Sequence, residues 1–136
     1  MQRFGVQEGE KWNEIWLKVF ARPAYKETGH WMIGSFRWHI FSYNYVPAAT
    51  GQEADALLRA QTDEDLIGIT DGVGSLKVFA VKREDLAGKI PGDFIVFPKD
   101  CLWTYAFTHE APHFGPYFTW HPDKPKILAK RKNTSL

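Results

Sequence analysis

The spacing of apolar residues changes along this chain from the period of a helix to that of a strand, which limits the folds it can adopt. Between Glu8 and Ala21, apolar residues recur at intervals of three and four, so five of them share one helix face: Trp12, Ile15, Trp16, Val19 and Phe20. Proline has no amide proton and disfavours helix in the residue before it, so we expect this helix to end at Pro23. The pattern predicts an amphipathic helix that packs on a core.

Two further elements are expected between residues 36 and 61. Aromatic and β-branched residues alternate over Phe36–Tyr43, which predicts a strand. Thr50 and Glu53 have the spacing of a capping box, in which a hydroxyl and a carboxylate each satisfy a free backbone amide. Apolar residues follow at helical spacing, so a second, short helix is predicted over Gln52–Gln61.

From residue 65 onward the pattern is typical of strands and turns. Strands are predicted at Leu66–Thr70, Leu76–Val81, Asp93–Phe97, Cys101–Thr108 and Tyr117–Trp120; breaks or turns are expected at Asp71–Gly74, Arg83–Leu86, Pro98–Asp100 and Gly115–Pro116. This order predicts an α+β fold: a mainly antiparallel sheet of about five to six strands, with the two amphipathic helices packed on one face. A chain of 136 residues suits one domain, which we place at residues 1–121.

Charge is distributed unevenly between that domain and the C-terminal segment. Residues 122–136 hold five basic side chains against Asp123, a net charge of +4, whereas residues 1–121 hold 12 basic and 15 acidic side chains, a net charge of −3. We expect the segment to be a flexible, solvated tail. An acidic body does not favour phosphate backbones, so nucleic acid is not the expected partner, although weak, salt-sensitive binding through the tail is a second alternative.

The N-terminal residues and the single cysteine bear on the compartment. Residues 1–8 lack the apolar core of a secretory signal, and no apolar run is long enough to cross a bilayer. Cys101 is the only cysteine, so no disulfide or thiolate metal cluster is expected, and this residue is predicted to be a small buried apolar group. We expect a cytoplasmic protein without a cofactor and without a membrane partner.

The string His109–His113 matches the H-E-x-x-H pattern of zinc proteases. That mechanism needs one helix turn to bring both imidazoles onto the metal. A strand is predicted immediately before the string, Pro112 lies inside it, and Gly115–Pro116 follows it. We therefore expect a polar loop at the end of a strand and no metal site.

The same residues also suggest an alternative function. His109 and Glu110 follow the predicted strand at the rim of an aromatic surface, and a histidine beside a carboxylate can act as a general base. His39, on another predicted strand, could join them. The alternative is a small hydrolase-like enzyme or ligand-binding domain using His39, His109 and Glu110, which requires these side chains to converge.

Several motifs in this chain occur together and in order: Trp38-His-Ile-Phe-Ser42, Asp93-Phe-Ile-Val-Phe97, Trp103-Thr-Tyr105, Thr108-His-Glu110 and Gly115-Pro-Tyr-Phe118. They resemble a bacterial family, typical of Bacillus and its relatives, that is a domain of unknown function with the pattern W-H-x-F-S, D-x-Y-V, W-T-Y-x-x-T-H-E and G-P-Y-F. The chain departs from it at Phe94-Ile95 and in its basic C-terminal extension, and His113 matches no motif position.

The resemblance implies no particular activity; small members of the family look like the immunity proteins encoded beside secreted bacterial toxins, which is an analogy of size and style. It favours a non-enzymatic binding protein that neutralises a toxin domain by protein–protein contact. The predicted binding residues are Trp103 and Tyr105 as anchors, with Thr108, His109, Glu110, Gly115, Pro116 and Tyr117 in the adjoining loop. A core position for Trp38, Trp103 and Tyr105 is the equal alternative, and Tyr117 is expected to pack inward.

Overall fold

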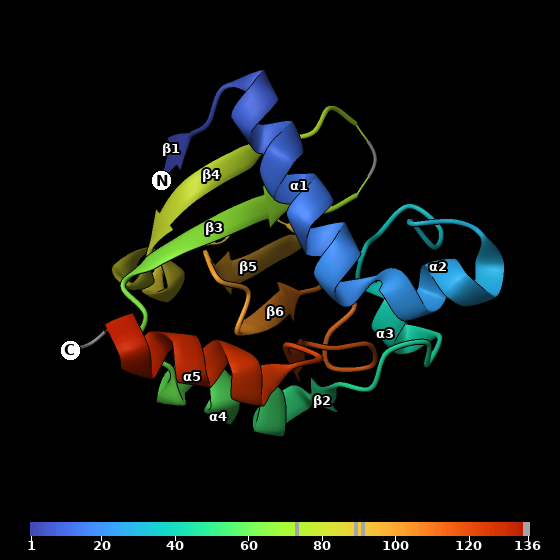
Figure 1. The fold of residues 1–136 in the computed structure, drawn as a ribbon. Helices are drawn as coiled ribbons and strands as arrows, with labels where there is room; N and C mark the ends of the chain where they lie inside the picture. The colour runs from blue at the N-terminus through green and yellow to red at the C-terminus, as the bar shows by residue number, and fades with distance from the viewer. Residues whose placement is uncertain (73, 89, 91, 135–136) are drawn as a thin grey trace.

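An antiparallel sheet with the strand order β1-β4-β3-β5-β6-β7-β2 is the centre of the fold (Figure 1). The computed structural model describes residues 1–72, 74–88, 90 and 92–134. In those residues the strands are β1 (Gln2–Arg3), β2 (Ala49–Thr50), β3 (Asp65–Thr70), β4 (Val78–Lys82), β5 (Phe94–Pro98), β6 (Trp103–Phe107) and β7 (Tyr117–Trp120). The helices are α1 (Val6–Phe20), α2 (Arg22–Thr28), α3 (His39–Ser42), α4 (Gly51–Ala60), α5 (Lys124–Thr134) and the 3₁₀ turn η1 (Arg83–Ala87).

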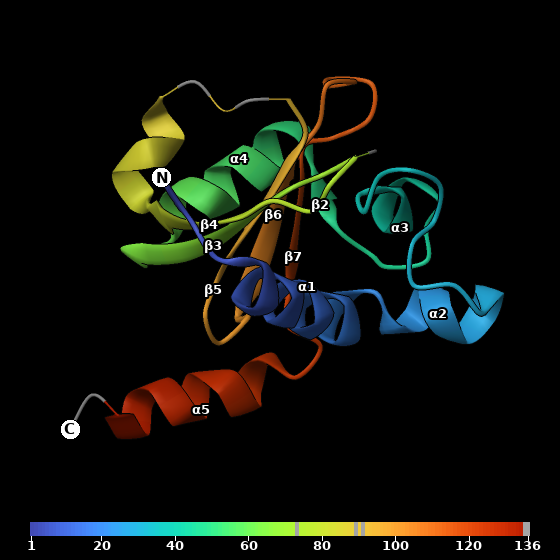
Figure 2. The ribbon, with the colours of Figure 1, turned by 90° about the horizontal axis from the view of Figure 1, so that it is seen from above.

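The α+β class is confirmed, but the layers differ from the prediction. The sheet has seven strands within the described residues, because β1 and β2 add a two-residue strand at each edge, too short to leave a sequence pattern. The two predicted helices form, as α1 and α4, but they cover opposite faces of the sheet rather than one (Figure 2). Val73, inside the predicted break at residues 71–74, lies outside the described residues.

Each face of the sheet has its own apolar core. On the α1 face, Trp16 and Phe20 pack against Ile67, Ile69 and further strand residues. On the α4 face, the cluster is built from alternate positions of the same strands and contains Ala54, Leu66, Val81, Phe94, Val96, Leu102, Trp103, Tyr105, Phe118 and Ile127. Because successive strand residues point to opposite faces, a sheet covered on both sides needs nearly continuous apolar strands, and every residue of β5 is buried.

The predicted strand at Phe36–Tyr43 is wrong, since this segment contains helix α3 and its flanking turns. The backbone amides of Arg37 and Trp38, at the start of the helical turns, have no acceptor within the helix. They donate instead to the carboxylate of Asp71, at 2.7 and 3.2 Å. The local sequence could not reveal this cap, because Asp71 lies more than thirty positions away. It does show aromatic residues, which have a high strand propensity, and these led to the wrong prediction.

One helix boundary agrees with the prediction and one predicted cap does not. The helix α1 ends at Phe20, before Pro23, as predicted; Pro23 itself lies in the first turn of α2, where a proline is tolerated because the first-turn amides have no intrahelical acceptor. Thr50 immediately precedes α4, as predicted, but its side chain makes no cap hydrogen bond among the described residues, so the predicted capping box with Glu53 does not form.

The basic segment after residue 121 contains a helix that the sequence did not predict. In α5, Ile127 is buried in the core of the α4 face, and Arg131 forms ion pairs with Asp63 and Asp100 at 2.9 and 2.6 Å. Figure 2 shows α5 lying apart from the other helices, at the end of the chain. The domain limit at residue 121, the flexibility of the tail and its weak binding of nucleic acid stay predictions.

Among the described residues, no helix combines the length and the apolar character needed to cross a bilayer.

Candidate functional site

The carboxylate of Asp93, just before β5, organises the candidate site. It is buried, and it accepts the indole N–H of Trp38 at 2.9 Å and the backbone N–H of His109 at 2.6 Å. The ring Nδ1 of His109 lies 2.8 and 2.9 Å from its two oxygens and therefore donates to this carboxylate. One buried group thus joins a segment before α3, the start of β5 and the loop after β6.

A second buried carboxylate, Asp71, supports the first. Besides the two backbone amides, it accepts a hydrogen bond from the guanidinium of Arg37 at 3.2 Å, and that guanidinium also donates to Asn13 in α1. The backbone N–H of Asp71 donates to the carbonyl of Asp93 at 2.9 Å. Burial raises the pKa of Asp71, because the loss of water outweighs the hydrogen bonds and positive charge that favour its ionised form. The network fixes the backbone amides of Arg37 and Trp38.

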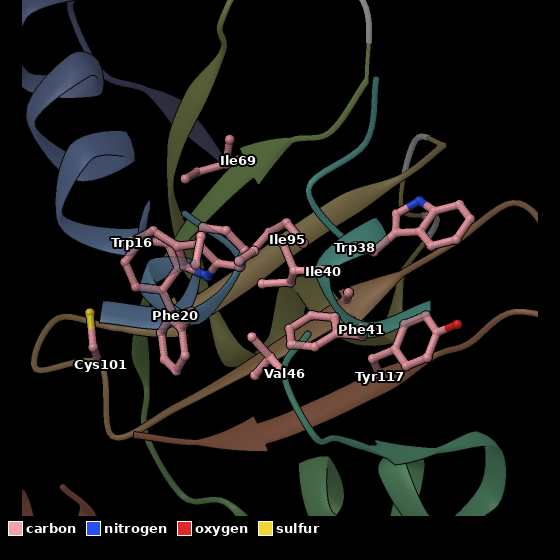
Figure 3. Packing of buried hydrophobic residues seen from close by; sticks show 14 of the residues in the cluster. Trp16, Phe20, Trp38, Ile40, Phe41, Val46, Ile69, Ile95, Cys101 and Tyr117 are labelled. Carbon is pink, nitrogen blue, oxygen red and sulfur yellow. The ribbon is translucent and has the colours of Figure 1, made fainter. Parts of the chain in front are cut away.

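Aromatic rings surround the Trp38 side chain at the same end of the core. Its ring centroid is 5.5 Å from that of Phe36, 6.2 Å from Tyr117 and 6.4 Å from both Phe114 and His109. Figure 3 shows Trp38 and Tyr117 together at one end of the cluster on the α1 face. Trp38 and Tyr117 are buried, whereas Phe114 remains 47% exposed, so a ring packed on the core also faces solvent.

Residues 108–115, which we call the site loop, are closed at their base. The Thr108 hydroxyl donates to the carbonyl of Phe114, and the backbone N–H of Phe114 donates to the carbonyl of Glu110 at 3.0 Å. Gly115 has a φ of +91°, and a Cβ there would lie 2.8 Å from Cγ2 of Thr108, so only glycine fits without displacement. This contact supports the predicted role of Gly115–Pro116 in directing the loop.

The H-E-x-x-H string lies in this loop and forms turns rather than a helix, as predicted. The described residues contain no group of three or more histidine, cysteine, aspartate or glutamate side chains arranged to hold a metal ion.

His109 is the exposed titratable group of the site. Its side chain is 52% exposed, and its Nε2 lies 3.7 Å from a carboxylate oxygen of Glu110. The hydrogen bond to Asp93 raises the pKa of His109, and the negative charges of Asp93 and Glu110 add to this, against a smaller effect of desolvation. With Nδ1 held by Asp93, only Nε2 is available to accept or donate a proton at the surface.

His39 lies near His109 but has different partners. Its Nδ1 is 3.1 Å from the Ser42 hydroxyl, and its ring stacks on Tyr43 with centroids 4.7 Å apart. The ring of Phe36 contacts both histidines, at 5.8 Å from His39 and 5.2 Å from His109. The structure therefore brings the predicted His39, His109 and Glu110 to one end of the sheet, with each imidazole bonded separately.

Comparison with known proteins matches residues 1–118 to a family described as Domain of unknown function (DUF4275). The chain belongs to the DUF4275 family. No curated protein and no solved structure matches it. The resemblance to a domain-of-unknown-function family is thus confirmed. The matched segment contains the whole candidate site and ends before α5.

In this DUF4275 protein, two predicted anchors are interior. Trp103 and Tyr105 are buried on the α4 face, where the indole N–H of Trp103 donates to Asp63 at 2.9 Å and the hydroxyl of Tyr105 donates to Asp55 of α4. Their exposure as anchors was the wrong alternative, because α4 covers the face on which they lie. Tyr117 also packs inward, as predicted.

The sequence analysis missed the residues that support the DUF4275 site. The sequence pattern predicts a strand at Phe36, a turn at Asp71 and the start of a strand at Asp93, and assigns none of the three to the site. Phe114 was overlooked, although a large apolar residue beside Gly115 in an otherwise polar loop is a usable sign of an exposed ring.

Cys101 is buried, as predicted, and burial raises the pKa of its thiol to about 12. Since the thiolate is the reactive form, burial disfavours the state in which Cys101 would act as a nucleophile.

Proposed function

We propose that this DUF4275 protein is a non-enzymatic, cytoplasmic binding protein of bacteria, of the immunity type, which neutralises a toxin domain by direct contact through the site loop. The observation that carries the proposal is Phe114, an exposed ring that stacks on buried Trp38 at the base of a braced loop. Aromatic side chains held in this way are frequent anchors of protein interfaces.

The bracing of the loop supports a role in recognition. Thr108 and Gly115 close its base, and Asp93 holds both the backbone and the ring of His109. A loop already ordered before binding loses less conformational entropy when it meets a partner, which raises affinity without new contacts. The body of the chain, residues 1–121, has a net charge of −3, which favours approach to a cationic toxin domain.

The proposal requires that a neighbouring gene encode a toxin domain, and the direct test titrates that purified domain into the protein by calorimetry. We expect binding with the wild type and a loss of at least about tenfold in affinity for Phe114→Ala, the change usual for an interface anchor. Tyr25→Ala is the matched control, because Tyr25 is a comparably exposed ring on α2 that stacks on Trp31. Equal affinity for the Phe114 variant and the wild type, or no binding by either, would contradict the proposal.

A second candidate function is a small hydrolase-like enzyme, favoured by the Asp93–His109 pair. A carboxylate that holds Nδ1 and leaves Nε2 exposed is the arrangement used by general bases. It predicts turnover of activated esters that disappears in His109→Asn and persists in Tyr25→Ala. Equal rates for these two variants and the wild type would exclude this use of His109.

A further inference from the structure

The space between His109 Nε2 and Glu110 requires a hydrogen-bond donor. Because Nδ1 donates to Asp93, the neutral ring presents a lone pair at Nε2. Glu110 places a carboxylate oxygen 3.7 Å away, which is a second acceptor facing the first. Two acceptors in this position repel each other unless a proton lies between them, so the pair accepts a proton on Nε2, a solvent water, or a donor from another molecule that displaces the water.

We propose that this position binds an arginine side chain of the protein partner when His109 is neutral, and that protonation of His109 displaces it. The inference rests on the proposed function, for which it specifies the chemistry of the partner. The planar guanidinium carries several N–H donors, so one can bond to Nε2 while another bonds to Glu110.

The charges around His109 suit a cationic group. Asp93 faces the ring from the start of β5 and Glu110 from the site loop itself. The rings of Phe36 and Trp38 on the adjoining segment are uncharged, and the neighbouring His39 is bonded to Ser42. Arg37, the nearest cation of that segment, is already paired with Asp71.

Because a proton and the guanidinium compete for Nε2 of His109, the affinity for arginine falls as the pH falls. Arginine binding requires the neutral ring, so affinity is constant at alkaline pH and falls about tenfold for each unit of pH below the pKa of His109. By the same linkage, the bound arginine lowers the pKa of His109. The pKa of His109 is raised in the free protein, so this change lies above the ordinary value of 6.5.

The test uses a blocked Gly-Arg-Gly peptide, with the citrulline peptide as the uncharged control, and follows the His109 ring by NMR. We expect the arginine peptide to shift the ring signals at about pH 8.5, to lower the pKa of His109, and to lose affinity at about pH 5.5. Glu110→Gln weakens binding, and His109→Gln removes its pH dependence. His30→Gln, at an exposed histidine outside the site, is the matched control, with both properties unchanged.

The proposal is overturned if the citrulline peptide binds equally well, if affinity is independent of pH, or if roughly 10 mM peptide leaves the ring signals in place. Failure of the peptide with retained binding of the toxin domain rejects this inference alone. Binding of the peptide without any toxin complex rejects the proposed function and keeps the arginine site.

Discussion

On both faces of the sheet, the polar group of a buried aromatic side chain donates a hydrogen bond to a carboxylate, but these hydrogen bonds have different roles on the two faces. On the α4 face, the polar groups of Trp103 and Tyr105 donate to Asp63 and Asp55. On the α1 face, the indole of Trp38 donates to Asp93. The aromatic rings are buried in all three cases.

The difference lies in what else each carboxylate binds. Asp55 belongs to α4, and Asp63 also pairs with Arg131 of α5, so on that face the bonds attach helices to the sheet. Asp93 also binds the backbone and ring of His109, so on its face the bond holds a half-exposed titratable group in place. A hydrogen bond from a buried tryptophan therefore indicates a functional site only when its acceptor also binds a residue at the surface.

The largest expected effect is that of Asp93→Ala. It leaves the Trp38 indole and the His109 amide without an acceptor, so we expect a loss of about 3 to 5 kcal/mol in the free energy of unfolding, measured in urea. Asp63→Ala is the comparison on the other face and is expected to cost less, since Asp63 is partly exposed. Equal losses would remove the distinction between the two faces.

A pair of tryptophan variants sharpens the comparison. Trp38→Phe and Trp103→Phe each remove an indole N–H that donates to a carboxylate, and each replaces a buried indole with a smaller ring. Each is therefore expected to lower the free energy of unfolding by about 2 kcal/mol. Only Trp38→Phe is expected to shift the NMR signals and pKa of His109. A shift produced by Trp103→Phe as well would show that the two faces are coupled.

Tyr105→Phe is expected to have a smaller effect, a loss of about 1 kcal/mol, because it removes a single hydrogen bond to Asp55. Burial raises the pKa of Tyr105, and its hydrogen bond to Asp55 raises the pKa further, so its hydroxyl stays protonated in alkaline solution. Absorbance titration of wild type and variant measures this directly. Ionisation of Tyr105 at the usual value of 10 would mean that the α4 face admits water.

The smallest effect is the pH dependence contributed by His109. Its pKa is raised in the folded protein, so its contribution to stability is full below the ordinary value of 6.5 and is lost as the pH rises through the folded-state value. Urea titrations should therefore show a larger stability difference between wild type and His109→Gln at about pH 5.5 than at about pH 8.5. The opposite order would argue against the bond to Asp93.

Periodicity predicted α1, α4 and strands β3 to β7, because their apolar spacing reflects burial on a fixed face. It failed at α3, which depends on Asp71, and at β1 and β2, which are too short to show a period. His109 and Glu110 were found as candidates at the end of a strand. Alternation showed that Trp103 and Tyr105 share a face, but it does not reveal what covers that face, and α4 does.

The close packing of Thr108 against Gly115 fixes the base of the site loop independently of the residues inside it. The residues that close the loop are fixed by a hydrogen bond and by the space left for a missing Cβ, whereas residues 111–113 between them are exposed. Exchange of these three positions is therefore expected to change specificity while the frame stays the same, and an engineer can use them to graft a foreign epitope.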